Sequence, residues 1–291
     1  MIGLILGHTG QLGEEFARSL APLGKARVLN RDKWNFENLE ETEKIIRLLK
    51  PDVILNAIAW TDVDKAEDYE EEANFVNAII PKNLAIISKR LGIKLVQIST
   101  DYVFSGNNSE PWNIDDQVQP INAYGRSKAL GEKYILDIYP ANTYLFRTAW
   151  LYSSHRVNFV KTMLSLALKN EESISVVDDQ FGQPTSARDL AAQIIHGLEE
   201  GISPGIYHAT NSGTATWNEF AKEIFILANQ EPTRVLPISS KDLIRRASRP
   251  KNSVLSHDCW AGTSLQPMRN WKVALAEQIE EIKSVVIAEN R

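Results

Sequence analysis

Residues 1–13 read MIGLILGHTGQLG, a short apolar run that leads into three evenly spaced glycines. The apolar run predicts a buried strand at Ile2–Leu6. After the glycines, leucine and phenylalanine recur at the spacing of one helical face, which predicts a helix at Leu12–Leu23. Gly7, Gly10 and Gly13 therefore occupy the turn between a strand and a helix. A buried strand that passes through a tight turn into an amphipathic helix is typical of an α/β fold.

The glycine-rich turn also predicts a ligand. Backbone N–H groups and the positive end of the helix dipole meet at such a turn, and glycines let a pyrophosphate approach them closely. The spacing G-x-x-G-x-x-G between a strand and a helix therefore predicts dinucleotide binding. The alternative is a tight turn in which Gly13 only allows close packing of the helix.

The end of the second expected strand bears on the choice of dinucleotide. An acidic residue there would bind the adenosine ribose and select NAD, but this chain has Asn30 followed by Arg31. Asn30 has no charge to repel a 2′-phosphate, and the guanidinium of Arg31 is suited to pair with one. We therefore expect NADPH as the cofactor, with NADH also accepted if Arg31 is only a surface charge.

The alternation of strand and helix continues through the first half of the chain. Further strands are expected at Ala26–Leu29, Val53–Ala57, Lys94–Ser99 and Tyr144–Arg147, and helices at Leu39–Leu49, about Ala73–Leu91 and Ala123–Ile138. Strands that are apolar on both faces and separated by helices predict a parallel sheet that is covered on both sides. The expected fold class is α/β, a Rossmann-type doubly wound parallel sheet.

The regular alternation of strands and helices ends after Trp150. The pattern predicts helices at Asn158–Leu168, Arg188–Glu199, Asn218–Ala228 and Trp271–Ala288, with short extended pieces at Ser173–Val177 and Gly205–His208. We expect residues 1–150 to form the dinucleotide-binding Rossmann domain. Residues 151–291 are expected to form mainly a smaller, substrate-binding lobe, with some segments that return to the first domain.

Composition excludes several classes of protein. With 291 residues, 43% of them apolar and 24% charged, the chain is typical of a globular protein. A net charge of −5 argues against a nucleic-acid surface, which would need a clustered excess of Lys and Arg. Cys259 is the single cysteine, so no intramolecular disulfide forms. No segment has the pattern of a signal peptide or a membrane span, and the expected location is the cytoplasm.

Charged runs elsewhere give no metal site. The acidic run Glu67–Glu72 fits a helix start, where negative charge is favoured, and we expect it to be a solvated face. The five histidines are dispersed without ligand spacing. Arg245, Arg246 and Arg249 either contact a substrate diphosphate or lie in a solvated loop.

The stretch INAYGRSKALGEK, residues 121–133, carries Tyr124 and Lys128 on one face of a helix. A free phenol with a pKa of about 10 is a poor proton shuttle at neutral pH. A nearby ammonium would lower the pKa of Tyr124, and the same lysine is able to hold a nicotinamide ribose. A third group is needed to hold a carbonyl oxygen beside the phenol, and the strand Lys94–Ser99 with the residues that follow it, Thr100–Phe104, places hydroxyls at its C-terminal end.

Seven segments in order carry a resemblance to a known family: 7–13 GHTGQLG, 56–67 NAIAWTDVDKAE, 99–106 STDYVFSG, 124–128 YGRSK, 146–152 FRTAWLY, 178–185 DDQFGQPT and 248–253 SRPKNS. They span nearly the whole chain. The sequence resembles the extended short-chain dehydrogenases/reductases and, within them, the dTDP-4-dehydrorhamnose reductase family.

This resemblance implies roles for individual residues. The family's catalytic residues fall on Tyr124, Lys128 and Thr100, and its substrate contacts on Thr100, Asp101 and Trp150. Its cofactor contacts fall on Gly10, Gln11, Leu12, Asn35, Phe36, Ala59, Trp60 and Thr61. The glycine turn and the end of the second strand add Gly7, Gly13, Asn30 and Arg31, and the pair on the helix adds Tyr124 and Lys128. The chain departs from the family pattern at three positions, because Asn30 and Asn35 stand where Asp is common and Trp60 stands where other members have His.

By the same resemblance, the expected reaction is reduction of the 4-keto group of dTDP-4-dehydro-β-L-rhamnose, with Tyr124 as the proton donor. Two alternatives remain open at this point. One is a reductase of another dTDP-4-keto-6-deoxyhexose. The other is a non-catalytic regulatory relative, against which the intact set of Thr100, Tyr124 and Lys128 argues. The expected partner is a small nucleotide sugar, and a homodimer is compatible with the sequence.

Overall fold

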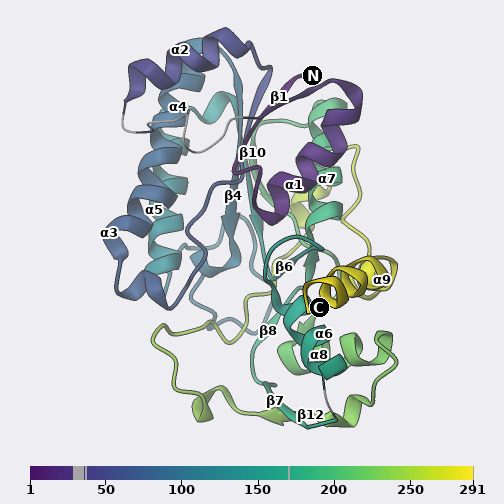
Figure 1. Cartoon of the computed structure of the whole chain (residues 1–291). Coiled ribbons are helices and arrows are strands. Elements are labelled where there is room, and N and C mark those ends of the chain that lie inside the picture. The colour runs from purple at the N-terminus through teal and green to yellow at the C-terminus, as the bar shows by residue number, and fades with distance from the viewer. Residues whose placement is uncertain (29–35, 37, 170, 291) are drawn as a thin grey trace.

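The computed structural model describes residues 1–28, 36, 38–169 and 171–290 (Figure 1). Its centre is a parallel sheet with the strand order β10-β5-β4-β3-β1-β2. The strands are β1 (Gly3–Leu6), β2 (Ala26–Val28), β3 (Val53–Asn56), β4 (Lys94–Thr100), β5 (Thr143–Thr148) and β10 (Gly205–His208). Strand β1 pairs with β2 on one side and β3 on the other, so the chain reverses its direction across the sheet there. Open α/β sheets bind ligands at the carboxyl ends of the strands at such a switch point.

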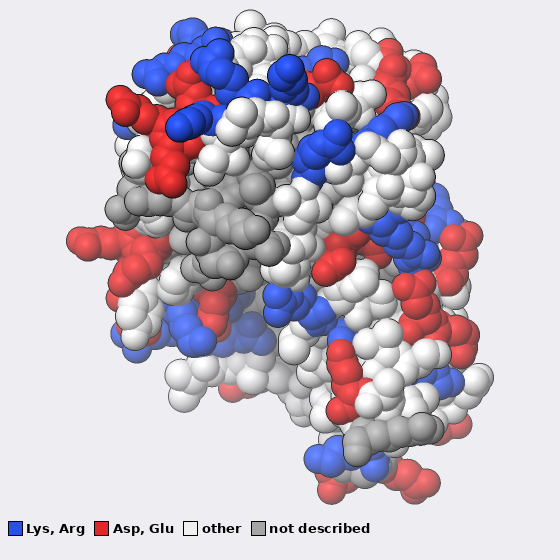
Figure 2. All heavy atoms as spheres, turned by 45° about the horizontal axis from the view of Figure 1, so that its top comes forward, with Lys and Arg blue, Asp and Glu red and all other residues white. Residues whose placement is uncertain are grey.

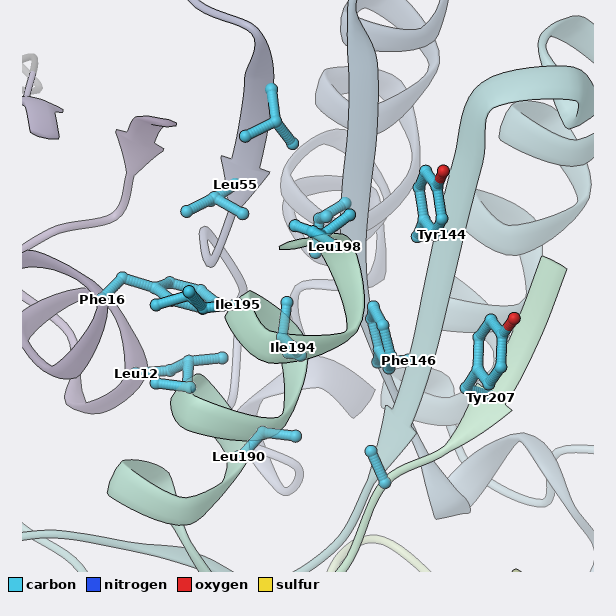
Figure 3. Close-up of a cluster of buried hydrophobic side chains, with 14 of the residues drawn as sticks. Leu12, Phe16, Leu55, Tyr144, Phe146, Leu190, Ile194, Ile195, Leu198 and Tyr207 are labelled. Atoms are coloured by element: carbon cyan, nitrogen blue, oxygen red, sulfur yellow. The ribbon is translucent and has the colours of Figure 1, made fainter. Parts of the chain in front are cut away.

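Helices cover both faces of the sheet, as Figure 1 shows. One face carries α2 (Leu39–Leu49), α3 (Glu70–Asn74), α4 (Ile80–Leu91) and α5 (Ala123–Ile138), and the other carries α1 (Gln11–Leu20) and α7 (Ala187–Glu200). On the second face, Phe16 and Ile194 from the helices pack in one buried cluster with Leu55 and Phe146 from the sheet (Figure 3). The predicted α/β fold with a doubly wound parallel sheet is confirmed.

The second half of the chain builds a smaller layer around α6 (Phe159–Lys169), α8 (Trp217–Leu227) and α9 (Trp271–Glu289). Tyr152, Phe220 and Trp271 lie in the buried cluster among these helices. Three short sheets join it: β6 (Leu151–Tyr152) with β9 (Thr185–Ser186), β8 (Phe181–Gly182) with β11 (Ala215–Thr216), and β7 (Ile174–Val177) with β12 (Val235–Ile238). Because β10 pairs with β5, the second half also contributes to the central sheet. The division into domains at residue 150 stays a prediction.

One expected helix is built differently from the prediction. The segment predicted as a helix at Ala73–Leu91 consists of α3, a π-helical turn at Phe75–Ile79, and α4. Pro81 has no N–H to donate to the carbonyl of Asn77 four residues earlier, so the regular ladder is interrupted there. The helix predicted at Leu12–Leu23 likewise ends at Leu20 and continues as a 3₁₀ turn over Ala21–Leu23. The other elements agree with the prediction to within about two residues.

The surface charge and the helix lengths bear on the class of protein. Acidic and basic side chains lie among one another over the face that Figure 2 shows. Within the described ranges, no helix is both long enough and apolar enough to cross a membrane.

Candidate active site

Helix α5 carries Tyr124 and Lys128 into the carboxyl edge of the sheet. Asn122 caps the helix, and its side-chain oxygen accepts from the N–H of Gly125 at 2.7 Å. A Cβ on Gly125 would lie 2.3 Å from the carbonyl oxygen of Tyr102, so a glycine is needed for this close approach. The buried Lys128 Nζ donates to the carbonyl of Ile98 at 2.7 Å, which fixes the ammonium against β4.

The end of β4 supplies the hydroxyl and the carboxylate. The Thr100 hydroxyl donates to Asp101 Oδ1 at 2.9 Å and accepts from the N–H of Tyr102 at 3.2 Å. Burial raises the pKa of Asp101 to about 6, although hydrogen bonds with Ser253 and Thr100 act in the opposite direction. Asp101 therefore changes its charge close to neutral pH.

The titration of Tyr124 differs from the expectation. Burial raises the pKa of its phenol to about 12, and a hydrogen bond with Thr100 opposes this rise only in part. Burial also lowers the pKa of Lys128 to about 8, against the effect of Glu132. The expected lowering of the phenol pKa by Lys128 is not seen, because burial has the largest effect on the phenol and raises its pKa, and the charge of Asp101 raises it further. Tyr124 is consequently protonated at neutral pH, which is the form that a proton donor needs.

The glycine loop lies at the switch point of the sheet, directly after β1. Gly7 has a φ of 78°, and a Cβ there would lie 2.8 Å from the backbone of Ala57. A Cβ on Gly13 would lie 2.1 Å from the carbonyl oxygen of Gly7, so these two glycines are required by the turn itself. A Cβ on Gly10 would meet only the Gly7 oxygen, at 3.2 Å, which leaves the outer side of this residue open. That open side suits the close approach of a ligand.

The first turn of α1 fits a dinucleotide pyrophosphate. Gly10 is the N-cap residue and has no side chain to accept from the first-turn amides, which include those of Gln11 and Leu12. Such amides have no partner inside the helix and favour an anion. The donors that a pyrophosphate needs are therefore available at this turn.

The loop after β3 forms the next wall and contains Ala59, Trp60 and Thr61. The N–H of Trp60 donates to Asn77 Oδ1 at 2.9 Å, and Asn77 Nδ2 donates to the carbonyl of Trp60 at 3.1 Å and to Ser127 Oγ at 2.9 Å. Asn77 thereby joins this loop to the helix of Tyr124 and Lys128. This role of Asn77 was not predicted from the sequence. Pro81, four residues later, is the signal that could have shown an interruption of the helix.

Only one residue of the expected adenosine end of the cofactor site lies in the part of the chain that the structure describes. Phe36 lies against α4, where Asn83 Nδ2 donates to its carbonyl at 2.9 Å. Asn30, Arg31 and Asn35 lie outside the described residues. Their expected part in the choice between NADPH and NADH stays a prediction.

Trp150 lies where the chain leaves the central sheet, with a φ of 46°. Its indole stacks on Trp217, with ring centroids 3.5 Å apart and planes 11° apart. A Cβ on Gly182 would lie 2.5 Å from the same indole, so a glycine is needed beside the ring. The half-buried ring is thus part of the aromatic packing of the second lobe, and its contact with a substrate stays a prediction.

Some charged side chains have partners that the sequence did not predict. Arg249 forms a bidentate pair with Asp64 at 3.0 and 2.8 Å, and Arg246 pairs with Asp68. Two further residues of the acidic run, which stay partly exposed, also have partners: Glu67 accepts from the N–H of Ala123 at 2.8 Å, and Glu70 pairs with Arg126. These contacts hold the segment before α3 and the segment around Arg249 against the start of α5.

The opposite edge of the sheet holds a cavity of about 660 Å³ lined by Met1, Asp52, Lys94 and Glu199, among others. It lies at the amino ends of the strands, where parallel α/β sheets do not bind their ligands, and is not the active site. In the part of the chain that the structure describes, no three His, Cys, Asp or Glu side chains are grouped as metal ligands.

Comparison with known proteins agrees with this geometry. The family model described as "RmlD substrate binding domain" matches residues 1–284. The chain belongs to this family. The resemblance drawn from the seven sequence segments is thereby confirmed.

Several similar proteins are named as reductases of dTDP sugars. The chain is 40% identical to a dTDP-4-dehydrorhamnose reductase of Streptomyces griseus, over 94% of this chain and 91% of that protein. It is 38% identical to a dTDP-4-keto-6-deoxy-D-glucose reductase of Streptomyces niveus, over 94% and 95%. Among solved structures, the dTDP-4-dehydrorhamnose reductase of Bacillus anthracis in complex with NADP matches with a TM-score of 0.91 and 35% identity, over 97% of this chain and all of that chain.

Proposed function

We propose that this chain is an NADPH-dependent reductase that converts dTDP-4-dehydro-β-L-rhamnose to dTDP-L-rhamnose by reduction of the 4-keto group. The observation that carries the proposal is the convergence of Tyr124, Thr100 and Lys128 at the carboxyl edge of the sheet that also carries the glycine loop. Its relatives in the same family, named for this reaction, support the choice of substrate.

The glycine loop and Lys128 would hold the cofactor. The open side of Gly10 and the first-turn amides of α1 suit its pyrophosphate. Lys128, whose Nζ lies against β4, would bind its nicotinamide ribose. NADPH, when bound, supplies a hydride to the keto carbon. The NADP complex of the Bacillus anthracis relative supports this cofactor, and NADH stays a second possibility.

Tyr124 would deliver the proton. As the hydride reaches the carbon, negative charge develops on the keto oxygen, and the phenol proton of Tyr124 is transferred to it. The Thr100 hydroxyl, which donates to Asp101 in the structure, would turn its proton to the same oxygen. Water would then return a proton to the phenolate that remains, and the positive charge of Lys128 on the same helix would favour the phenolate until then.

A coupled assay tests the proposal. The purified protein is given NADPH and dTDP-4-dehydro-6-deoxyglucose, with and without the 3,5-epimerase that forms the proposed substrate. We expect NADPH oxidation that depends on the epimerase. No oxidation in either reaction would contradict the proposed function.

The relative from Streptomyces niveus favours one second candidate, because its name gives dTDP-4-keto-6-deoxy-D-glucose as the substrate. If this chain shared that specificity, NADPH oxidation would proceed at the same rate without the epimerase. The stereochemistry of the product at C4 then separates the two reductases.

The cytoplasmic location and a homodimer stay predictions. Cell fractionation followed by immunoblotting tests the first, and light scattering on the purified chain tests the second. A membrane-bound fraction or a monomer at working concentration would contradict them.

A further inference from the structure

The segment after β6 reaches across to the glycine loop. Ser153 Oγ donates to Gln11 Oε1 at 3.1 Å, and Gln11 Nε2 donates to the carbonyl of Leu151 at 3.4 Å. Next to them, Arg156 Nε donates to the carbonyl of Thr9 at 2.6 Å. These three contacts join the second half of the chain to the turn between β1 and α1.

Arg156 is held in an unusual backbone conformation. Its φ is 57°, in the left-handed region that residues other than glycine rarely adopt. Asn158 Nδ2 donates to the carbonyl of Ser153 at 2.8 Å, and this bond closes the loop around Arg156. Burial does not explain the conformation, because the Arg156 side chain is exposed. Residues held in such conformations are frequent at functional sites.

The guanidinium of Arg156 has free donors. It carries five N–H bonds in a planar fork, and Nε uses one of them on Thr9. In the described ranges of the chain, neither terminal nitrogen has an ion pair or a hydrogen bond. The fork is thus fixed at the glycine loop with two nitrogens available, beside the first-turn amides of α1. Arginine in this arrangement pairs with phosphate oxygens.

We infer that Arg156 is a further ligand of the cofactor and binds its diphosphate beside the glycine loop. The inference rests on the proposed NADPH site. The diphosphate is the group assigned, because Thr9 lies in the turn after β1. A 2′-phosphate would lie at the end of β2.

Binding measurements on three variants test the inference. The dissociation constants of NADPH and NADH are measured by calorimetry for the wild type, Arg156→Gln, Arg156→Lys and Arg156→Gly. Arg47→Gln is the matched control, because Arg47 is an exposed arginine that pairs with Glu43 on α2. We expect Arg156→Gln to weaken both cofactors by about tenfold or more, Arg156→Lys to weaken them less, and the control to change neither.

Arg156→Gly separates binding from folding. Glycine adopts the left-handed conformation without strain, so this variant should unfold at the same or a higher temperature while it loses the same affinity as Arg156→Gln. A purely structural role would lower both properties or neither.

Three results would overturn the inference in distinguishable ways. Unchanged affinity of Arg156→Gln for both cofactors removes Arg156 from the site. A loss for NADPH alone contradicts the diphosphate and assigns the 2′-phosphate. A wild-type protein that binds neither cofactor contradicts the proposed function itself.

Discussion

The side-chain amide of Asn122 donates to the carbonyl of Ser248 at 2.8 Å, across 126 residues of sequence. The oxygen of the same side chain caps α5 through the N–H of Gly125. On either side of Ser248, the N–H of Ala247 and the guanidinium of Arg249 bind Asp64. The start of the helix that carries Tyr124 is therefore fastened to the segment around Ser248.

We expect Asn122→Ala to lower both stability and turnover. Loss of an N-cap costs about 0.5–2 kcal/mol of the free energy of unfolding, and here it also releases the helix turn that holds Tyr124. Urea denaturation and steady-state kinetics measure the two effects. Asn38→Ala is the matched control, because Asn38 caps α2 through the N–H of Glu41 and lies away from the site. The account requires a lower kcat for Asn122→Ala alone, so an equal kcat in both variants would contradict it.

We expect cofactor use to weaken in alkaline solution because of Lys128. Its pKa is lowered to about 8, so the side chain is charged below that pH and neutral above it. The value of kcat/KM for NADPH should therefore fall about tenfold per pH unit above the pKa. Lys128→Arg keeps its charge throughout this range, so its lower activity should lack the alkaline fall. A flat profile for the wild type up to about pH 10 would argue against the role given to Lys128.

The buried His208 should limit stability in acid. Burial and the charge of Arg147 lower its pKa from 6.5 to about 3. Its Nδ1 donates to the carbonyl of Ser256 at 3.1 Å, and Nε2 faces Arg147 at 3.4 Å, so the folded state holds the neutral ring. The neutral ring of His208 stabilises the folded state fully above the unfolded pKa of 6.5. This stabilisation is lost as the pH falls through 6.5 toward 3, because the unfolded state then binds a proton that the folded state does not.

We therefore expect wild-type protein to lose about 2 kcal/mol more than His208→Gln between about pH 7 and about pH 5. Denaturant unfolding at each pH measures the difference. His196→Gln is the control, because His196 is exposed on α7. Parallel pH curves for the wild type and His208→Gln would show that His208 does not set this loss.

The sequence predicted the central architecture well. The local pattern of apolar residues predicts buried strands such as Val53–Asn56 and the amphipathic helix α2, and this pattern does not depend on the neighbours of the element in the fold. The local pattern does not predict which other strand a strand pairs with. The pattern at Gly205–His208 gave a strand, but only the structure shows that β10 extends the central sheet beside β5.

The candidate site, too, could be predicted only where the pattern is local. The sequence predicted that Tyr124 and Lys128 lie on one face of a helix, because helical residues four apart share a face. The hydrogen bond from Lys128 to Ile98, the bracing by Asn77 and the contact of Arg156 with Thr9 join residues 30 or more positions apart, or depend on an irregular turn. No local pattern predicts such contacts, nor does it predict the burial that shifts the pKa values of Tyr124 and Lys128.

The comparison of Tyr124→Phe with Tyr102→Phe tests the central claim most directly. The two rings contact each other edge to face, with centroids 5.9 Å apart, so each substitution removes one hydroxyl from the same aromatic pair. Single-turnover oxidation of NADPH with the epimerised substrate measures the reduction step. We predict a loss of about 10²–10⁴-fold for Tyr124→Phe and a rate close to wild type for Tyr102→Phe. An undiminished rate for Tyr124→Phe would contradict its role as the proton donor.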